Sequence, residues 1–285
     1  MLTEGWPDAP EPLPLPVVDN HCHLDHPAFF KGEPNRTIPV DEALDRAAVV
    51  NVTRTVQVGC DVESSQWAVA TATAYPSVVA AVAIHPNDAA RMEGLDEGLA
   101  EIDRLAADPS ARAVGETGLD YFRTGAELRP VQHASFREHI RIAKRHDRTL
   151  VIHDRDSHDD VLAILDDEGV PERVVMHCFS GDADFARECL ARGAFLSFAG
   201  TVTFSNAQPL RDALQVTPLD RILVETDAPF LTPTPHRGRP NASFLIPLTV
   251  RFMAAERGIE VAELCAAIDS ATDRAFGGRW DQRFC

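Results

Sequence analysis

The feature of this sequence that most constrains its fold is a short run of β-branched and other apolar residues that recurs along the chain. The eight runs occupy residues 17–24, 54–60, 78–86, 111–120, 149–154, 173–181, 194–200 and 221–229. Each run is nearly continuous in apolar residues, as expected of a strand that is buried on both faces of a parallel sheet. We therefore predict eight parallel strands.

Segments rich in alanine, arginine and glutamate, with the spacing of helices, separate these runs; residues 64–74 and 131–146 are examples. Strands that alternate with helices form a parallel α/β sheet, and eight such units favour a closed (β/α)8 TIM barrel over an open, doubly wound sheet. No linker or shift of composition divides the chain. The predicted fold is a single-domain α/β barrel at residues 17–285, preceded by a proline-rich leader at residues 1–16.

The composition of the chain argues against several classes of protein. Acidic residues, arginines or prolines interrupt every apolar run, so no run reaches the roughly 18 to 20 residues that span a bilayer. The N-terminus lacks the basic and apolar regions of a secretion signal, and the six cysteines lack the spacing of a zinc knuckle or a disulfide framework. We predict a cytoplasmic protein with reduced thiols. Its formal net charge of −17 opposes tight binding of polyanions, so any phosphate must be held locally, by metal ions or a few arginines.

Ionisable side chains stand at the C-terminal ends of the predicted strands, which is where barrels carry their chemistry. His21 and His23 end the first strand, and because alternate strand residues share a face, both can bind one ion. Glu116 lies between small residues in the segment 115–120 that ends the fourth strand, where a carboxylate needs a cation nearby to stay charged. Simpler explanations exist for each: ordinary hydrogen bonds for the histidines, and a salt bridge to an arginine for Glu116.

The remaining strand ends extend this pattern. His153 and His177 end the fifth and sixth strands, and Glu225 and Asp227 share a face at the end of the eighth. Nitrogen and carboxylate ligands together suit zinc, manganese or a similar ion better than calcium. Six ligands exceed one tetrahedral site with an open position, so we predict two divalent ions that share a bridging carboxylate, with Glu116 as the bridge. The predicted ligands are His21, His23, Glu116, His153, His177 and Asp227.

Seven ordered segments resemble the signature blocks of the TatD-type metal-dependent deoxyribonucleases, a family of the amidohydrolase-like superfamily. The segments are VVDNHCHLD, AIHPND, VGETGLDYF, LVIHDRD, VMHCFSGD, LVETDAPFLTP and HRGRPN. The resemblance implies a (β/α)8 barrel that binds two divalent metals (zinc, manganese or magnesium) and hydrolyses phosphodiester bonds in DNA, often from the 3′ end. It assigns His21, His23, Glu116 and Asp227 to one ion and Glu116, His153 and His177 to the other. It also places His85 near the substrate phosphate.

On this interpretation Asp227 and Glu116 are the catalytic carboxylates. Asp227 orients the attacking water and accepts its proton, while Glu116 bridges the ions. His85, Arg237 and Arg239 are predicted to bind the phosphate oxygens, although the loop with the two arginines can equally be a structural anchor. The expected substrate is DNA, single-stranded or at its 3′ ends, and no protein partner or membrane is indicated.

Two other functions stay open on the sequence. The same metals can cleave a C–N or ester bond of a small molecule, as related barrels do; those barrels usually bridge their metals with a modified lysine, whereas Glu116 occupies that position here. A catalytically idle metal-binding barrel is the second alternative. Such a protein is expected to have lost one or more ligands, and all six are present in this chain.

Overall fold

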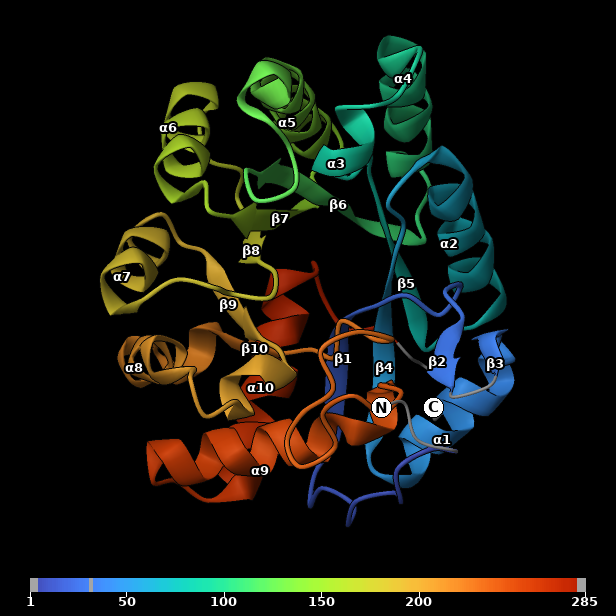
Figure 1. The fold of residues 1–285 in the computed structure, drawn as a ribbon, viewed down its shortest axis with the longest axis vertical. Helices are drawn as coiled ribbons and strands as arrows, with labels where there is room; N and C mark the ends of the chain where they lie inside the picture. Colours follow the sequence, from blue (N-terminus) through green and yellow to red (C-terminus); the bar gives the residue numbers. More distant parts are fainter. Residues whose placement is uncertain (1–4, 31–32, 281–285) are drawn as a thin grey trace.

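Eight parallel strands form the barrel in the computed structural model, which describes residues 5–30 and 33–280 (Figure 1). The strands are β1 (Val17–Cys22), β4 (Val52–Val58), β5 (Val78–Val82), β6 (Ala111–Asp120), β7 (Thr149–Arg155), β8 (Val174–Met176), β9 (Phe195–Phe198) and β10 (Ile222–Val224). They lie side by side in chain order, and a parallel bridge between Cys22 and Ala228 brings the last strand back to the first. The predicted α/β barrel is confirmed.

Helices follow the strands and surround the ring that they form, except that the last helix packs its end against the core inside the ring (Figure 1). They are α1 (Val40–Val49), α2 (Val62–Ala74), α3 (Pro86–Ala89), α4 (Leu95–Ala106), α5 (Arg129–Arg145), α6 (His158–Glu168), α7 (Ala183–Ala191), α8 (Gln208–Val216), α9 (Ile246–Arg257) and α10 (Val261–Ala275). Short 3-10 turns span Ala126–Leu128, Gly200–Thr203, Leu219–Arg221 and Ser243–Leu245. None of the described helices is long and apolar enough to cross a membrane.

Alternation along the strands divides the buried residues into two cores. In β5, for example, Val79 and Ala81 belong to one core and Ala80 and Val82 to the other. The first core contains strand residues from all eight strands together with the end of α10 and Trp280, and the second joins the outside of the barrel to the helices. Successive strand residues point to opposite faces, which explains why the runs are apolar at nearly every position.

The end of α10 closes the barrel at the N-terminal end of its strands through a buried charge. Arg54 near the start of β4 is fully buried, and it donates hydrogen bonds to Asp273 at 2.7 Å and to Asp269 at 2.5 Å. Its guanidinium carbon lies 4.5 Å from the centre of the Trp280 ring. Because a buried charge is tolerated only when it is paired, this contact fixes α10 against the strands.

Two parts of the chain outside the predicted strands and helices also take defined positions. A small antiparallel pair, β2 (Ala28–Phe30) and β3 (Glu33–Arg36), follows the first barrel strand. The proline-rich segment before β1 packs on the barrel through Leu13, which is buried, and through the edge of the Trp6 ring against Phe244. Of the six cysteines, Cys285 lies outside the described residues, and the other five are free thiols.

Several strands end earlier than the sequence predicts. β8 stops at Met176 and β10 at Val224, so His177 and Asp227 lie in the loops just beyond them. Cys178 and Asp227 adopt positive φ values of 42° and 55°, a backbone conformation that a strand cannot contain. The alternation that we applied to Glu225 and Asp227 therefore does not extend to them, and the turn sets the direction of each side chain.

Candidate metal centre

The six predicted ligands converge at the C-terminal end of the barrel strands. His21 comes from β1, Glu116 from β6 and His153 from β7. His23 directly follows β1, and the loops after β8 and β10 supply His177 and Asp227. The imidazoles of His21 and His177 stack with their ring centres 3.5 Å apart. Side chains far apart in the sequence thus form one compact group of imidazoles and carboxylates.

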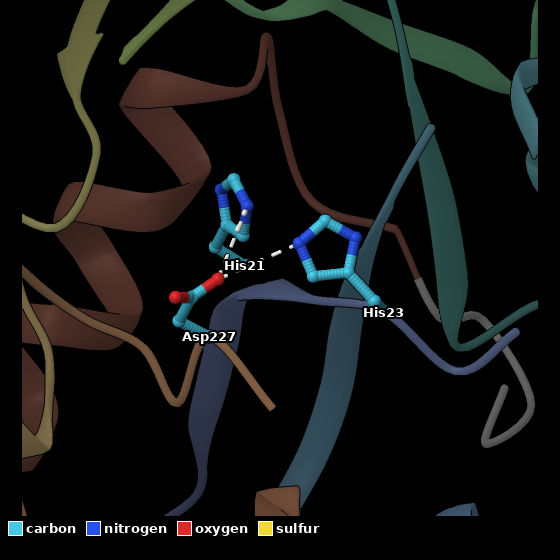
Figure 2. A group of neighbouring side chains, drawn as sticks. All are labelled: His21, His23 and Asp227. Atoms are coloured by element: carbon cyan, nitrogen blue, oxygen red, sulfur yellow. Dashed lines mark ion pairs between the residues drawn. The ribbon is translucent and has the colours of Figure 1, made fainter. Parts of the chain in front are cut away.

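Asp227 faces both histidines of the first strand, as Figure 2 shows. Its Oδ1 atom lies 3.4 Å from Nε2 of His23 and 3.8 Å from Nε2 of His21. A hydrogen bond from the Asp227 amide to the carbonyl oxygen of His21, 2.9 Å long, holds the loop beside β1. The three ligand atoms lie close enough together to surround one ion.

The two carboxylate oxygens of Glu116 face different members of the group. Oε1 lies 3.9 Å from Nε2 of His21 and 3.9 Å from Nε2 of His23. Oε2 lies 3.2 Å from Nδ1 of His153 and 3.2 Å from Nε2 of His177. One carboxylate therefore lies between two sets of imidazoles, which is the arrangement that a bridging ligand requires.

The electrostatics of the group favour a cation. Burial alone would raise the pKa of Glu116, but the imidazoles of His177 and His85 hold that pKa well below its usual range. Burial lowers the pKa of His153, but its contacts with Asp120 and Glu116 outweigh this effect and raise the pKa to about 9. Positive charge is thus stabilised beside Glu116, and a metal ion supplies such charge without a proton.

A buried histidine without hydrogen bonds gives an independent test of whether these residues fit a metal. His21 is fully buried, and neither of its ring nitrogens has a hydrogen-bond partner in the part of the chain that the structure describes. Burial lowers its pKa well below the usual value, so the ring is neutral and has a lone pair to offer. Because an unsatisfied buried polar group is costly, the position of His21 is explained if Nε2 binds a metal.

A second layer of polar groups orients the candidate ligands. His23 Nδ1 lies 3.1 Å from the carbonyl oxygen of Val58, and His177 Nδ1 lies 2.8 Å from Oε1 of Glu225. His153 Nε2 lies 3.4 Å from Oδ2 of Asp120. The hydrogen bond of His23 fixes the direction of its ring. The contacts of His177 and His153 are ion pairs with a carboxylate on the side of each ring. Glu225 thus contacts Nδ1 of His177, whereas Nε2 of the same ring faces Glu116. Asp227, by contrast, lies among the candidate ligands.

Two residues that the sequence analysis did not select also touch the group. Asp120 ends β6 four residues after Glu116, and Cys60 follows the end of β4 with its Sγ atom 3.6 Å from Oε1 of Glu116. His23, Cys60 and Glu116 could together hold an ion. Both residues stand at or just after the end of a barrel strand. The position at a strand end that predicts the other ligands therefore indicates these two residues as well.

His85, predicted to lie near the substrate, stands at the N-terminus of α3. Its Nδ1 atom accepts a hydrogen bond from the Asn87 amide at 3.1 Å, and its Nε2 atom lies 3.9 Å from Oε1 of Glu116. Burial lowers its pKa to about 4, so the ring is neutral near pH 7. Because Nδ1 is an acceptor, the proton is on Nε2, and that atom can donate a hydrogen bond at the edge of the group.

The structure places Arg237 and Arg239 elsewhere. Arg239 donates hydrogen bonds to the carbonyl oxygens of Gly5 and Trp6, at 3.3 and 2.8 Å, and Arg237 lies over the ring of Phe204 with its guanidinium carbon 4.0 Å from the ring centre. Neither is among the described residues that line the cleft over the candidate ligands. Their role in substrate binding stays a prediction, while Arg239 has the contacts of an anchor for the N-terminal segment.

An open cleft of about 1180 Å³ lies over the candidate ligands. Glu116, His153, His177 and Asp227 are among the residues that line it. Further lining residues are Trp67, Arg91, Arg123, Arg155 and Phe230, together with acidic residues that include Asp61, Glu63 and Asp88. The cleft gives a substrate direct access to the carboxylates and imidazoles, and its volume exceeds that of most small-molecule pockets.

A (β/α)8 barrel with histidines and carboxylates converging at the C-terminal ends of its strands defines the class of metal-dependent hydrolases. A family model described as TatD related DNase matches residues 18–277. The chain is 41% identical over 269 residues to a protein of Mycobacterium tuberculosis described as an uncharacterized metal-dependent hydrolase TatD, covering 93% of this chain and 99% of that protein. The chain therefore belongs to the TatD family of metal-dependent hydrolases.

Other relatives agree with this assignment. The Bacillus subtilis metal-dependent hydrolase YabD is 35% identical over 262 residues, covering 91% of this chain and 98% of that protein. The crystal structure of YjjV, a TatD homologue from Escherichia coli, superposes with a TM-score of 0.83 at 27% identity, covering 92% of this chain and 98% of that one. The likeness extends over nearly the whole barrel in sequence and in structure.

Proposed function

We propose that this protein hydrolyses phosphodiester bonds in DNA, as a deoxyribonuclease of the 3′ exonuclease type that depends on two divalent metal ions. The observation that carries the proposal is the position of Glu116, whose two oxygens face separate sets of imidazoles on the floor of an open cleft. Two-metal sites of this kind serve phosphoryl transfer in nucleases and phosphatases. The word DNase in the description of the matching family supports the choice of substrate.

The candidate ligands divide between the two ions. His21, His23 and Asp227 with Oε1 of Glu116 would hold one ion, and His153 and His177 with Oε2 of Glu116 would hold the other. When bound, such ions lower the pKa of a coordinated water and neutralise charge on the phosphate. Zinc, manganese and magnesium are the candidates, and the nitrogen-rich ligand set favours the first two.

The side chains around the ions have separate tasks. Asp227 is partly accessible from the cleft, and its carboxylate is placed to orient a water molecule and accept its proton. The Nε2 proton of neutral His85 is available to a phosphate oxygen. Arg123 and Arg155 line the same cleft, and a guanidinium suits the paired oxygens of a phosphodiester.

The alternative of C–N or ester hydrolysis has less support. A barrel that bridges its metals with a modified lysine needs that lysine at a strand end, and Glu116 occupies the bridging position here. An idle barrel is disfavoured because every predicted ligand is present and turned toward the group.

The test is to strip the metals, restore magnesium, manganese or zinc separately, and follow single-stranded DNA labelled at its 5′ or its 3′ end. A panel of ester and amide substrates runs in parallel. We expect no turnover without metal, recovery with at least one ion, and early release of the 3′ label as mononucleotide. Turnover of only the ester or amide substrates would refute the nuclease proposal, and early release of the 5′ label would reverse the direction.

A further inference from the structure

Two exposed aromatic rings stand at the mouth of the barrel. The exposed large hydrophobic residues of the described chain are Leu15, Val49, Phe122 and Phe230. Phe122 follows β6 and Phe230 follows β10, and these two strands are four places apart in a ring of eight. The two rings therefore stand after opposite strands of the barrel, with the candidate metal centre between them.

Phe122 is the more exposed of the two, with 63% of its surface accessible. The neighbouring Tyr121 has clear structural contacts, because its hydroxyl donates a hydrogen bond to Asp160 and its ring lies under the guanidinium of Arg129. Phe122 instead contacts Arg155, whose guanidinium carbon lies 4.1 Å from the centre of the phenylalanine ring. This contact leaves most of the Phe122 ring open to solvent.

Arg155 connects this ring to the candidate active site. It is the last residue of β7, two positions after His153, and it lines the cleft together with Arg123. Both arginines are exposed, and in residues 5–30 and 33–280 no carboxylate forms an ion pair with either guanidinium. In a chain with a formal net charge of −17, unpaired arginines beside an exposed ring are notable. Arginines with aromatic rings are the combination that binds the backbone and bases of single-stranded nucleic acid.

We propose that Phe122 and Arg155 form a nucleobase subsite on the rim of the cleft. A base of the substrate stacks on the exposed surface of the Phe122 ring, and Arg155 binds the phosphate next to that base. This inference rests on the proposed function and refines it, because a base is free to stack in this way only when it is unpaired. The preferred ligand is therefore a single strand that continues beyond the nucleotide being cleaved.

The test compares Phe122→Ala with the wild type on two ligands, an oligodeoxynucleotide that carries the fluorescent base 2-aminopurine and a matched strand with an abasic position. Binding is measured by anisotropy, and stacking by the rise in 2-aminopurine fluorescence when the base leaves its neighbours in the strand for the Phe122 ring. We expect Phe122→Ala to weaken binding of the intact strand about tenfold and to remove this rise. The same substitution should change binding of the strand whose subsite position is abasic by less than about twofold. Val49→Ala, which removes an exposed side chain on α1, is the control and should change neither result.

Hydrolysis separates failure of the subsite from failure of the proposed function. For Phe122→Ala, the ratio of kcat/KM on the oligonucleotide to kcat/KM on bis(p-nitrophenyl) phosphate should fall about tenfold. Equal binding, fluorescence change and selectivity in wild type and variant would overturn the subsite even if DNA is cleaved. If the wild type binds the strand with the Phe122-dependent rise in fluorescence but does not cleave it, the subsite stands and the proposed nuclease function fails.

Discussion

Replacing Asp227 with asparagine should lower kcat on single-stranded DNA by roughly 10²–10⁴-fold, the range attributed to general acid–base catalysis. The amide keeps the size of the side chain but removes the charge that faces His21 and His23, and it cannot accept a proton from water. Activity of the metal-loaded variant is measured against a 3′-labelled strand at saturating substrate concentration. Near-wild-type turnover would remove Asp227 from the mechanism.

The fold of this variant should be intact, for a reason that can be read from the backbone. Asp227 has a φ of 55°, and asparagine is among the few residues that tolerate this conformation. The circular dichroism spectrum of the metal-free variant should match that of the metal-free wild type. Asp88→Asn is the matched control, because it removes a carboxylate that also lines the cleft but belongs to none of the candidate ligand groups.

Replacing Arg54 with alanine should lower the free energy of unfolding by about 3–5 kcal/mol, the cost of breaking a buried ion pair from one side. The substitution removes the buried one of the two arginines that contact Asp269 and Asp273, and it opens a space under Trp280. The loss should appear in urea titrations as a lower midpoint of unfolding.

Arg279→Ala supplies the matched control for this prediction. Arg279 contacts the same Asp269, at 2.9 Å, but half of its side chain is exposed to solvent. Exposed ion pairs contribute about 0–1 kcal/mol, so its loss should change stability little. If both variants lose the same small amount, the buried charge of Arg54 is not what holds α10 in the barrel.

Much of the fold was predictable because each barrel strand is buried on both faces. Runs such as 78–86 contain apolar residues at nearly every position, and this pattern separates parallel strands from surface strands. The position of the end of α10, which closes the barrel, was not predictable, because the sequence of an amphipathic helix does not show which surface the helix covers. The pair of Arg54 with Asp269 joins residues 215 positions apart, and such contacts leave no local signal.

The candidate site was predictable to the extent that function follows strand ends. His21 and His23 lie at the end of the first predicted strand, Glu116 lies in the last half of the fourth, and the structure brings them together. The separate positions of Glu225 and Asp227 were not predictable, because the chain leaves the strand at Val224 and turns through a positive φ. The role of Arg239 in binding phosphate stays a prediction, because its sequence neighbours do not show the hydrogen bonds that it makes to the distant carbonyl oxygens of Gly5 and Trp6.

The central claim is that Glu116 bridges two divalent ions, and anomalous diffraction from crystals of the zinc-loaded or manganese-loaded protein tests it most directly. We expect two anomalous peaks roughly 3.5 to 4 Å apart, as in other two-metal hydrolytic sites. One peak should lie among His21, His23 and Asp227, and the other beside His153 and His177, with a Glu116 oxygen next to each. A single peak at full metal occupancy, or two peaks of which only one contacts Glu116, would contradict the account.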